Sequence, residues 1–217
     1  MTRSKKEYPL KYYPPFEEKL NVISHAIGIA GGVIALIMML QKVWGKDATH
    51  IYAVLIYGIS IITLYTASTL FHSCKAPRLR HRLNVFDHSA IYFLIAGTYT
   101  PYTLITLQGS TGWIVFAAIW TAALGGIILK LFFTGKYRIL STIMYVLMGW
   151  MVVFAIKPLY NSMELEGFVW LMAGGLAYTF GAVLYAVKKI PYNHAIFHVF
   201  VLVASICHFI SIYKFVI

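Results

Sequence analysis

The feature that most constrains this 217-residue chain is a succession of seven apolar stretches separated by short polar breaks. A helix rises about 1.5 Å per residue, so about 20 apolar residues cross the ~30 Å hydrocarbon core of a membrane. Barrel strands would instead alternate apolar and polar residues over segments of about ten, and the sequence has no such alternation. We predict an all-α fold, a bundle of seven transmembrane helices. The predicted spans are 20–41, 50–73, 86–107, 112–133, 138–157, 167–187 and 193–216.

The composition supports one membrane domain. Only 12% of the residues are charged, whereas about 25% is usual for a soluble domain. We therefore expect a seven-helix membrane domain at 20–217, preceded by a cytoplasmic or interfacial N-terminal segment at 1–19. That segment lacks the apolar core of a cleavable signal peptide, so we expect a multi-pass protein that stays in the plasma membrane, with the lipid bilayer as its surroundings.

The basic residues predict the orientation of the bundle. The net charge of +11 comes from lysines and arginines at helix ends and not from one basic face, so we expect no nucleic-acid partner. Of the 18 lysines and arginines, 14 fall on the side of the N-terminus and four on the opposite side. Because cytoplasmic loops carry the excess of positive charge, the N-terminus is predicted to be cytoplasmic and the C-terminus outside.

Four polar residues inside the predicted spans fall at one depth. His194 and His198 are four residues apart, so their imidazoles share one face at the start of the seventh span. His72 ends the second span and Asp87 begins the third, which brings both to the same side of the membrane. Ionisable groups in a span are costly and tend to face the bundle and to be functional.

Three imidazoles match the ligand set of a catalytic zinc site, which leaves one position for water. Zinc lowers the pKa of such a water toward about 7, and Asp87 is positioned to orient or deprotonate it. Ser68, one turn before His72, is a second candidate catalytic residue. Copper, iron or nickel would also suit nitrogen ligands. The alternative is that His194 and His198 only form hydrogen bonds between packed helices.

A second polar group, Glu17, Glu18, Asn21 and His25, begins the first span. Glu17, Asn21 and His25 are spaced four residues apart and so share one stripe of a helix. We interpret Asn21 and His25 as side chains that orient a metal ligand or Asp87. We interpret the two glutamates as an acidic first turn that complements the helix dipole.

Other residues predict details of packing. Gly28-x3-Gly32 is typical of close helix contacts, which we expect to be intramolecular. Pro101 and Pro158 are expected to kink or end helices. His208 lies ten residues after His198, roughly 15 Å along the same helix, so it is too far to share a metal ion and is expected to form a hydrogen bond in the bundle.

Several of these residues fall into motifs that resemble those of the bacterial hemolysin III family, a branch of the progestin and adipoQ receptor family. The similarity runs over essentially all seven spans. The matching motifs are Glu18-x2-Asn21-x2-Ser24-His25-x2-Gly28, Ser68-x3-His72, Asp87-His88-Ser89-Ala90-Ile91-Tyr92 through Ala96-Gly97-Thr98-Tyr99-Thr100-Pro101, and His194-x3-His198.

The resemblance implies a zinc ion held by His72, His194 and His198, with Asp87 bonded to the zinc water and Ser68 beside it. It also implies kinship with alkaline ceramidases, which cleave lipid amides, and a link to membrane lipid homeostasis. Three functions follow as hypotheses. The first is a zinc-dependent hydrolase of a lipid amide or ester. The second is a sensor of lipid or membrane state with a structural zinc, and the third is a hemolysin-type cytolysin.

Overall fold

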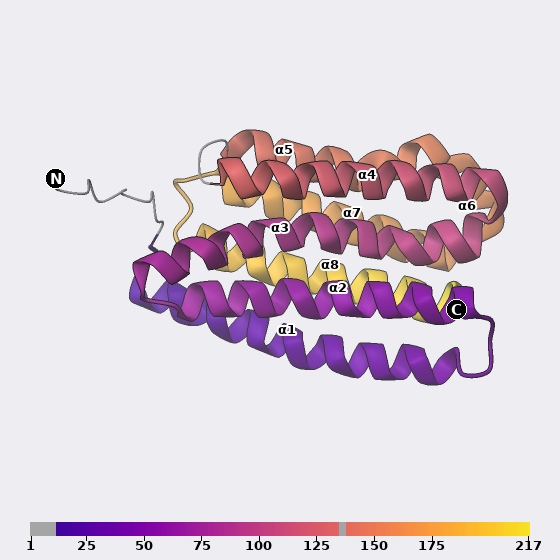
Figure 1. Cartoon of the computed structure of the whole chain (residues 1–217), viewed down its shortest axis with the longest axis horizontal. Coiled ribbons are helices and arrows are strands. Elements are labelled where there is room, and N and C mark those ends of the chain that lie inside the picture. The colour runs from indigo at the N-terminus through magenta and orange to yellow at the C-terminus, as the bar shows by residue number, and fades with distance from the viewer. Residues whose placement is uncertain (1–11, 135–137) are drawn as a thin grey trace, which may run out of the picture.

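The computed structural model describes residues 12–134 and 138–217, and all the elements in these ranges are helices. They form seven spans that are long and apolar enough to cross a membrane, and they lie side by side along the long axis of the molecule (Figure 1). This confirms the predicted all-α, seven-span fold. The helices are α1 (Pro15–Lys42), α2 (Ala48–Ser73), α3 (Pro77–Pro101), α4 (Gly109–Phe133), α5 (Arg138–Gly149), α6 (Ile156–Ser162), α7 (Leu165–Ala186) and α8 (Asn193–Phe215).

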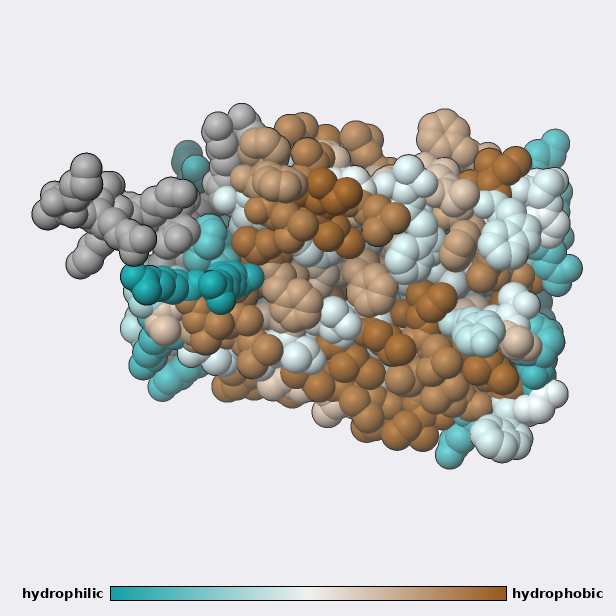
Figure 2. Space-filling view, viewed as in Figure 1, coloured by the Kyte–Doolittle hydropathy of each residue, from teal (hydrophilic) through white to brown (hydrophobic). Residues whose placement is uncertain are grey.

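The lateral surface of the bundle is apolar. Figure 2 shows hydrophobic residues over the middle of the molecule and hydrophilic residues gathered toward its two ends. Large side chains on this surface are widely exposed, among them Ile27 at 63%, Ile114 at 68% and Phe132 at 75%. Such a continuous apolar surface would be unfavourable in water, so the surroundings it fits are lipid tails.

The interior of the bundle is formed chiefly by three helices. Over their most apolar stretch, α2 and α3 are 56% buried and α8 is 50% buried, whereas the other four spans are 28% buried or less. These three helices carry His72, Asp87, His194 and His198. The predicted site residues therefore lie on the interior helices of the fold.

Glycines bring α1 against α2. A Cβ atom on Gly28 would lie 2.7 Å from the ring of Tyr65, and one on Gly32 would lie 2.9 Å from a methyl carbon of Ile61. Contacts this short do not occur between real side chains, so the two helices can approach this closely only because these positions are glycine. The predicted intramolecular role of the Gly28-x3-Gly32 pair is confirmed.

Two helices begin earlier than the hydropathy pattern predicted. α1 begins at Pro15 and not at residue 20, and α3 begins at Pro77 and not at residue 86. Proline suits a first helical turn because its φ angle is already helical and its missing N–H has no partner to lose there. Consequently Arg80, which falls between the predicted spans 50–73 and 86–107, lies inside α3 and is only 2% exposed.

Two proline-linked irregularities interrupt the spans. α3 widens into a π-helical turn at Tyr102–Leu107 directly after Pro101, and a 3-10 segment at Trp150–Ala155 separates α5 from α6. In the second case Pro158 follows the break, and it has no N–H with which to continue the α-helical hydrogen bonding. The Tyr99 hydroxyl bonds to the backbone at the start of this segment, since it donates to Gly149 O and accepts from the Val152 N–H, each at 2.7 Å.

Candidate metal centre

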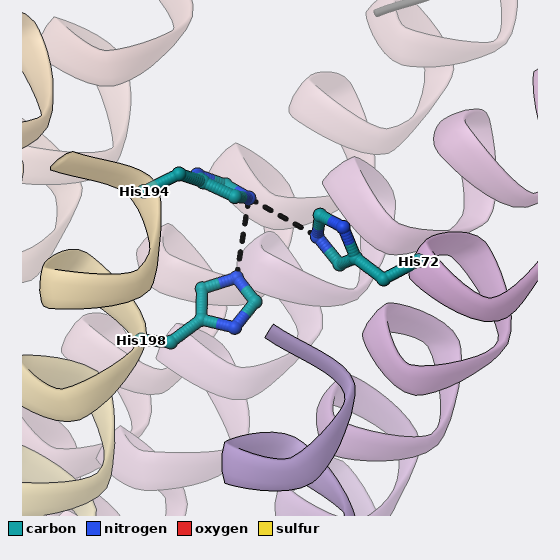
Figure 3. A group of neighbouring side chains, drawn as sticks. All are labelled: His72, His194 and His198. Atoms are coloured by element: carbon teal, nitrogen blue, oxygen red, sulfur yellow. Dashed lines mark hydrogen bonds between the residues drawn. The ribbon is translucent and has the colours of Figure 1, made fainter. Parts of the chain in front are cut away.

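Three histidine side chains meet at the end of the bundle where α1 and α8 begin and α2 ends. His72 belongs to the last turn of α2, while His194 and His198 belong to the first two turns of α8. Nε2 of His194 lies 3.1 Å from Nε2 of His72 and 3.2 Å from Nε2 of His198 (Figure 3). Since one nitrogen from each ring lies within 4.8 Å of the others, the three residues could hold a metal ion.

The spacing of the three nitrogens fits tetrahedral coordination. Zinc binds imidazole nitrogen at about 2.0–2.1 Å, so two nitrogens on a tetrahedral ion are roughly 3.3–3.4 Å apart. The two measured separations of 3.1 and 3.2 Å lie close to this value. Three imidazole nitrogens are a donor set for zinc, and also for copper, iron or nickel. The residues present therefore fit the expected metal.

Glu18 holds the ring of His72 from the side opposite the ligand nitrogen. Its Oε2 lies 2.6 Å from Nδ1 of His72, a contact between residues 54 positions apart in the chain. A ligand histidine usually donates its other ring N–H to such an acceptor, which fixes both the tautomer and the ring orientation. With Nδ1–H directed at Glu18, Nε2 of His72 keeps its lone pair for a metal.

Arg80 in turn holds Glu18. Its guanidinium forms an ion pair with Oε1 of Glu18, and it also donates to Phe71 O at 3.1 Å and to Cys74 O at 2.9 Å. These carbonyls belong to the C-terminal end of α2, where the regular hydrogen bonds of the helix end, and Arg80 donates hydrogen bonds to them. The same arginine positions the Glu18 carboxylate, which orients the ring of His72. Neither role was predicted from the sequence, since the two glutamates were interpreted as complementing the helix dipole and Arg80 falls between the predicted spans 50–73 and 86–107.

Further side chains of α1 lie against the other faces of the ligands. The ring of His25 stacks on His198, with centroids 3.7 Å apart and planes 7° from parallel. Ser24 Oγ lies 3.4 Å from Nδ1 of His198, and Asn21 Nδ2 lies 3.4 Å from Nδ1 of His72. Asn21 and His25 are thus next to the ligands, as expected from their stripe on the helix, while Ser24 was named only as part of a family motif and was given no role.

The residues before and at the start of α1 contact His194. Tyr13 stacks on its ring with centroids 4.4 Å apart and planes 6° from parallel. Oε1 of Glu17 accepts a hydrogen bond of 3.2 Å from the His194 backbone N–H, which places a carboxylate at the N-terminus of α8, where the helix dipole favours negative charge. Burial raises the pKa of the Tyr13 phenol above its ordinary value, so this ring is neutral. The first turns of α1 and the residues just before it therefore cover the histidine cluster on one side.

Asp87 and Ser68 lie along one cavity with two of the three histidines. Asp87 is 8% exposed and Ser68 is 1% exposed, and a side-chain hydrogen bond joins them. Both line a cavity of about 190 Å³ whose wall also includes His194 and His198. The structure therefore brings both predicted catalytic residues into the cavity that borders the histidine cluster.

The cavity is long and mainly apolar. It extends from the histidine cluster past Leu94 and Val201 to Leu159 and Leu171, which belong to the opposite half of the bundle. Its shape and lining would suit a hydrocarbon chain with a polar end at the histidines. His88 also lines it, but its Nδ1 is 2.9 Å from Asn84 O and 3.7 Å from Asp87, so His88 lies outside the cluster of three.

The fold and this cluster define a class, namely a seven-span helical membrane protein with a candidate metal centre buried at one end of its bundle. Within that class, residues 14–209 match the model of the family described as haemolysin-III related. The chain belongs to this family, and it is a multi-pass membrane protein.

Similarity to individual proteins extends over most of the chain. The chain is 45% identical to Hemolysin-3 of Bacillus cereus over 201 residues, which cover 92% of each protein. It is 42% identical to the Hemolysin-3 homolog of Bacillus subtilis, with 90% of this chain and 92% of the relative covered. It is also 29% identical to the human monocyte to macrophage differentiation factor, with 94% and 87% covered. This more distant similarity connects the chain to the progestin and adipoQ receptor family, as its motifs indicated.

Proposed function

We propose that this protein is a zinc-dependent hydrolase that cleaves an amide or ester bond of a membrane lipid and so contributes to membrane lipid homeostasis. One observation carries the proposal: the three-histidine cluster, the Asp87–Ser68 pair and an apolar cavity open onto one another. A purely packing role for the histidines would require neither an acid beside them nor a cavity along them.

The residues would divide the work as follows. His72, His194 and His198 would hold the ion, and Glu18 would fix the ring of His72. When bound, zinc supplies a Lewis acid that polarises a carbonyl and activates water at neutral pH. The Asp87 carboxylate would accept the proton of the attacking water and return it to the leaving group. The Ser68 hydroxyl, bonded to Asp87, would keep this carboxylate aimed at the reacting bond.

The cavity would select the substrate. Its apolar wall would bind a hydrocarbon chain and exclude bulk water, which strengthens the interactions of the few polar groups within it. A lipid could enter from the bilayer without leaving it, because the cavity lies inside the spanning part of the bundle. We further propose that the metal centre lies in the cytoplasmic half of the membrane, as the distribution of lysine and arginine predicts.

Orientation can be tested independently of activity. A single cysteine added after Ile217 in a background without Cys74 and Cys207 should react in intact cells with a maleimide that does not cross membranes. A cysteine at Ser4 should react only after the cells are opened. The opposite pattern would contradict the proposed orientation.

The test of the hydrolase proposal has two stages. Metal content is first measured by mass spectrometry on wild-type protein, His194→Ala and the control His208→Ala. We expect about one zinc per chain in the wild type and in the control, and loss of the ion in His194→Ala. Wild type and Asp87→Asn are then compared on a panel of lipid amides and esters.

Asp87→Asn is expected to retain zinc and to lose turnover by a factor of 10² or more, the usual contribution of a general base. Full turnover in Asp87→Asn would show that the proposed proton transfer is wrong. Absence of metal from wild-type protein purified without chelator would exclude the hydrolase proposal altogether.

A second candidate function is a sensor with structural zinc. It is favoured by the origin of the ligands, because His72 on α2 and His194 and His198 on α8 would be tied together by one ion. This function does not need Asp87. A lipid-dependent phenotype that survives Asp87→Asn but not His194→Ala would support the sensor.

The names of the two Bacillus relatives suggest cytolysis as a third function. A chain with seven apolar spans needs a bilayer around it, so it is poorly suited to leave one cell and attack another. We expect purified protein at a low ratio of protein to lipid to leave an encapsulated dye inside liposomes. Dye release under these conditions would support cytolysis instead.

A further inference from the structure

The cavity reaches a second histidine, far from the metal centre. His208 lies on α8 ten residues after His198, roughly 15 Å along the helix axis, and it lines the same cavity. It is 7% exposed. Its imidazole rests on the backbone of α7 at Gly174, where a Cβ atom would lie 2.2 Å from the histidine Cδ2. The ring can therefore occupy this position only because residue 174 has no side chain.

The hydrogen bonds of His208 determine which of its ring nitrogens can still accept a hydrogen bond. Nε2 lies 3.2 Å from Leu171 O, and a carbonyl oxygen can only accept, so Nε2 carries the hydrogen. In a neutral imidazole the other nitrogen, Nδ1, is then an acceptor. Nδ1 is buried and has no hydrogen-bond partner in the described ranges 12–134 and 138–217. Because buried polar atoms are nearly always hydrogen-bonded, this nitrogen is expected to accept a hydrogen bond from a bound group.

Two threonines of the cavity wall and Ser205 also keep oxygen lone pairs that can accept a hydrogen bond. Thr98 and Thr103, which line this half of the cavity, donate their hydroxyl hydrogens to carbonyl oxygens of their own helix and leave oxygen lone pairs. Ser205 Oγ accepts from Tyr65 at 2.8 Å and lies 3.0 Å from the Tyr178 hydroxyl, whose ring is 5.6 Å from that of His208. This region is therefore suited to a group that donates a hydrogen bond.

We propose that His208 forms a second recognition site in the cavity, which binds a hydroxyl group carried on the hydrocarbon chain of the lipid. The site rests on the proposed hydrolase function, since it assumes that the polar end of the lipid lies at the three histidines. The hydroxyl would donate to Nδ1 of His208, and it would sit roughly 15 Å from the bond that is cleaved. The preferred substrates are then lipids with a hydroxylated long chain.

The apolar stretch between the two polar regions strengthens this assignment. Leu94 and Val201 lie on the cavity wall between the histidine cluster and His208, so a chain that reaches His208 from the metal centre must be hydrocarbon over this distance. A ligand with a polar group at its end and a hydroxyl further along its chain matches both polar regions and the apolar wall between them. A plain acyl chain would leave Nδ1 without a partner.

The test is a binding measurement on the purified full-length protein, so it does not depend on turnover. A fluorescent fatty acid is displaced by octadecanoic acid or by octadecanoic acids that carry one hydroxyl at successive chain positions. We expect one position to bind at least tenfold more tightly than the plain chain, because a site built for a hydroxyl discriminates against its absence. Equal affinity at every position would overturn the proposal.

Two variants identify the nitrogen responsible. His208→Asn puts an amide near the position of Nδ1, whereas His208→Gln puts one near Nε2 and can preserve the bond to Leu171 O. We expect the hydroxyl preference to persist in His208→Asn and to disappear in His208→Gln. The reverse result would mean that His208 is only structural.

The outcomes separate this site from the hydrolase proposal. A positional preference in wild-type protein without any turnover would support the second site while the hydrolase proposal fails. If instead the protein turns over lipids with and without a chain hydroxyl equally well, and binds every hydroxylated acid with the same affinity, the hydrolase proposal stands and the second site fails. Because the position series needs only the wild type, the result stands even where a variant does not fold.

Discussion

At the scale of single residues, the contact between Glu18 and His72 does most to organise the histidine cluster. Three neutral imidazoles can share hydrogen atoms among themselves in several ways, and most of these leave a ligand nitrogen protonated. The 2.6 Å contact from Nδ1 of His72 to Glu18 selects the tautomer whose Nε2 is free for a metal. Glu18 is itself held by Arg80, so the ring position is set before any ion binds.

This contact leads to the first prediction. Glu18→Gln replaces a charged acceptor by a neutral amide and should lower zinc affinity by about 10–100-fold, the usual cost of losing a partner of a ligand histidine. Affinity is measured by competition with a chromogenic chelator. Glu17→Gln is the matched control, because Glu17 contacts the backbone N–H of His194 and not a ligand ring. Equal losses in the two variants would show that general charge near the centre, and not ring orientation, sets the affinity.

The residues of the site differed in how far the sequence could reveal them. His194 and His198 were predictable because a four-residue spacing fixes their relative position in any helix, and topology brought His72 to the same depth. Glu18 and Arg80 were missed because their roles depend on tertiary contacts across 54 and 62 positions, which no local pattern encodes. The roles of Asp87, Ser68, Asn21 and His25 stay predictions, although their positions beside the centre agree with them.

At the scale of whole elements, the packing of α1 on α2 depends on Gly28. Gly28→Ala would put a Cβ atom 2.7 Å from the Tyr65 ring, which also contacts His25 edge to face at 5.0 Å. We expect this variant to be destabilised by about 1–3 kcal/mol, the usual cost of overpacking, and to bind zinc more weakly. Gly31→Ala is the control, since its Cβ would meet nothing within 4 Å.

Thermal unfolding in detergent measures both glycine variants. Gly31→Ala should be neutral or slightly stabilising, because alanine favours helix over glycine. A melting temperature for Gly28→Ala equal to that of Gly31→Ala would mean that the two helices can separate slightly without loss, and that their close contact is not needed.

The start of α2 gives a prediction about pH. Asp47 caps this helix, with Oδ1 accepting from the backbone N–H groups of Thr49 at 2.8 Å and His50 at 3.2 Å. These hydrogen bonds, that of His50 foremost, hold the pKa of Asp47 below its ordinary value. A carboxyl whose pKa is lowered by folding stabilises the protein above the unfolded pKa, near about 3.9, and loses this effect as the pH falls through the folded pKa.

Asp47→Ala should therefore melt at a lower temperature than wild type at neutral pH, and the difference should shrink in acid below about pH 4. Asp47→Asn is the matched control, since asparagine also caps helices but does not titrate in this range. The measurement is thermal unfolding of the three proteins at several pH values. A gap between wild type and Asp47→Ala that is constant with pH would rule out the charged cap as its source.

Element boundaries show where hydropathy is an incomplete guide. The first ten residues of α3 include three arginines and one histidine, so a hydropathy window begins the span at residue 86 although the helix begins at Pro77. The side chain of Arg80 belongs inside only because Glu18 and the carbonyls of α2 surround it. Likewise, Pro158 predicted an interruption near the end of the apolar run 138–157, but not its form, a 3-10 segment at Trp150–Ala155. The Tyr99 hydroxyl of another helix bonds to the backbone at its start, and no local pattern encodes that contact.

At the scale of the whole molecule, the histidine cluster connects α8, near the C-terminal end of the chain, to α2 near its beginning. A metal ion bound by His72 of α2 and by His194 and His198 of α8 would link these two helices directly. An ion that binds the folded bundle and not the unfolded chain adds stability, about 2.7 kcal/mol when the free ion is at 100 times its dissociation constant. Metal binding and the stability of the bundle are therefore expected to be coupled.

The last prediction uses this coupling to separate a catalytic from a structural ion. Chelator should lower the melting temperature of wild-type protein and of Asp87→Asn equally, because the ligands are the same in both. It should leave His194→Ala unchanged, since that variant has no ion to lose. If Asp87→Asn keeps the full response to chelator but has no lipid turnover, then Asp87 acts in the chemistry and not in holding the bundle. If chelator lowers the melting temperature of His194→Ala as well, the stabilising ion lies elsewhere in the protein and the histidine cluster has another role.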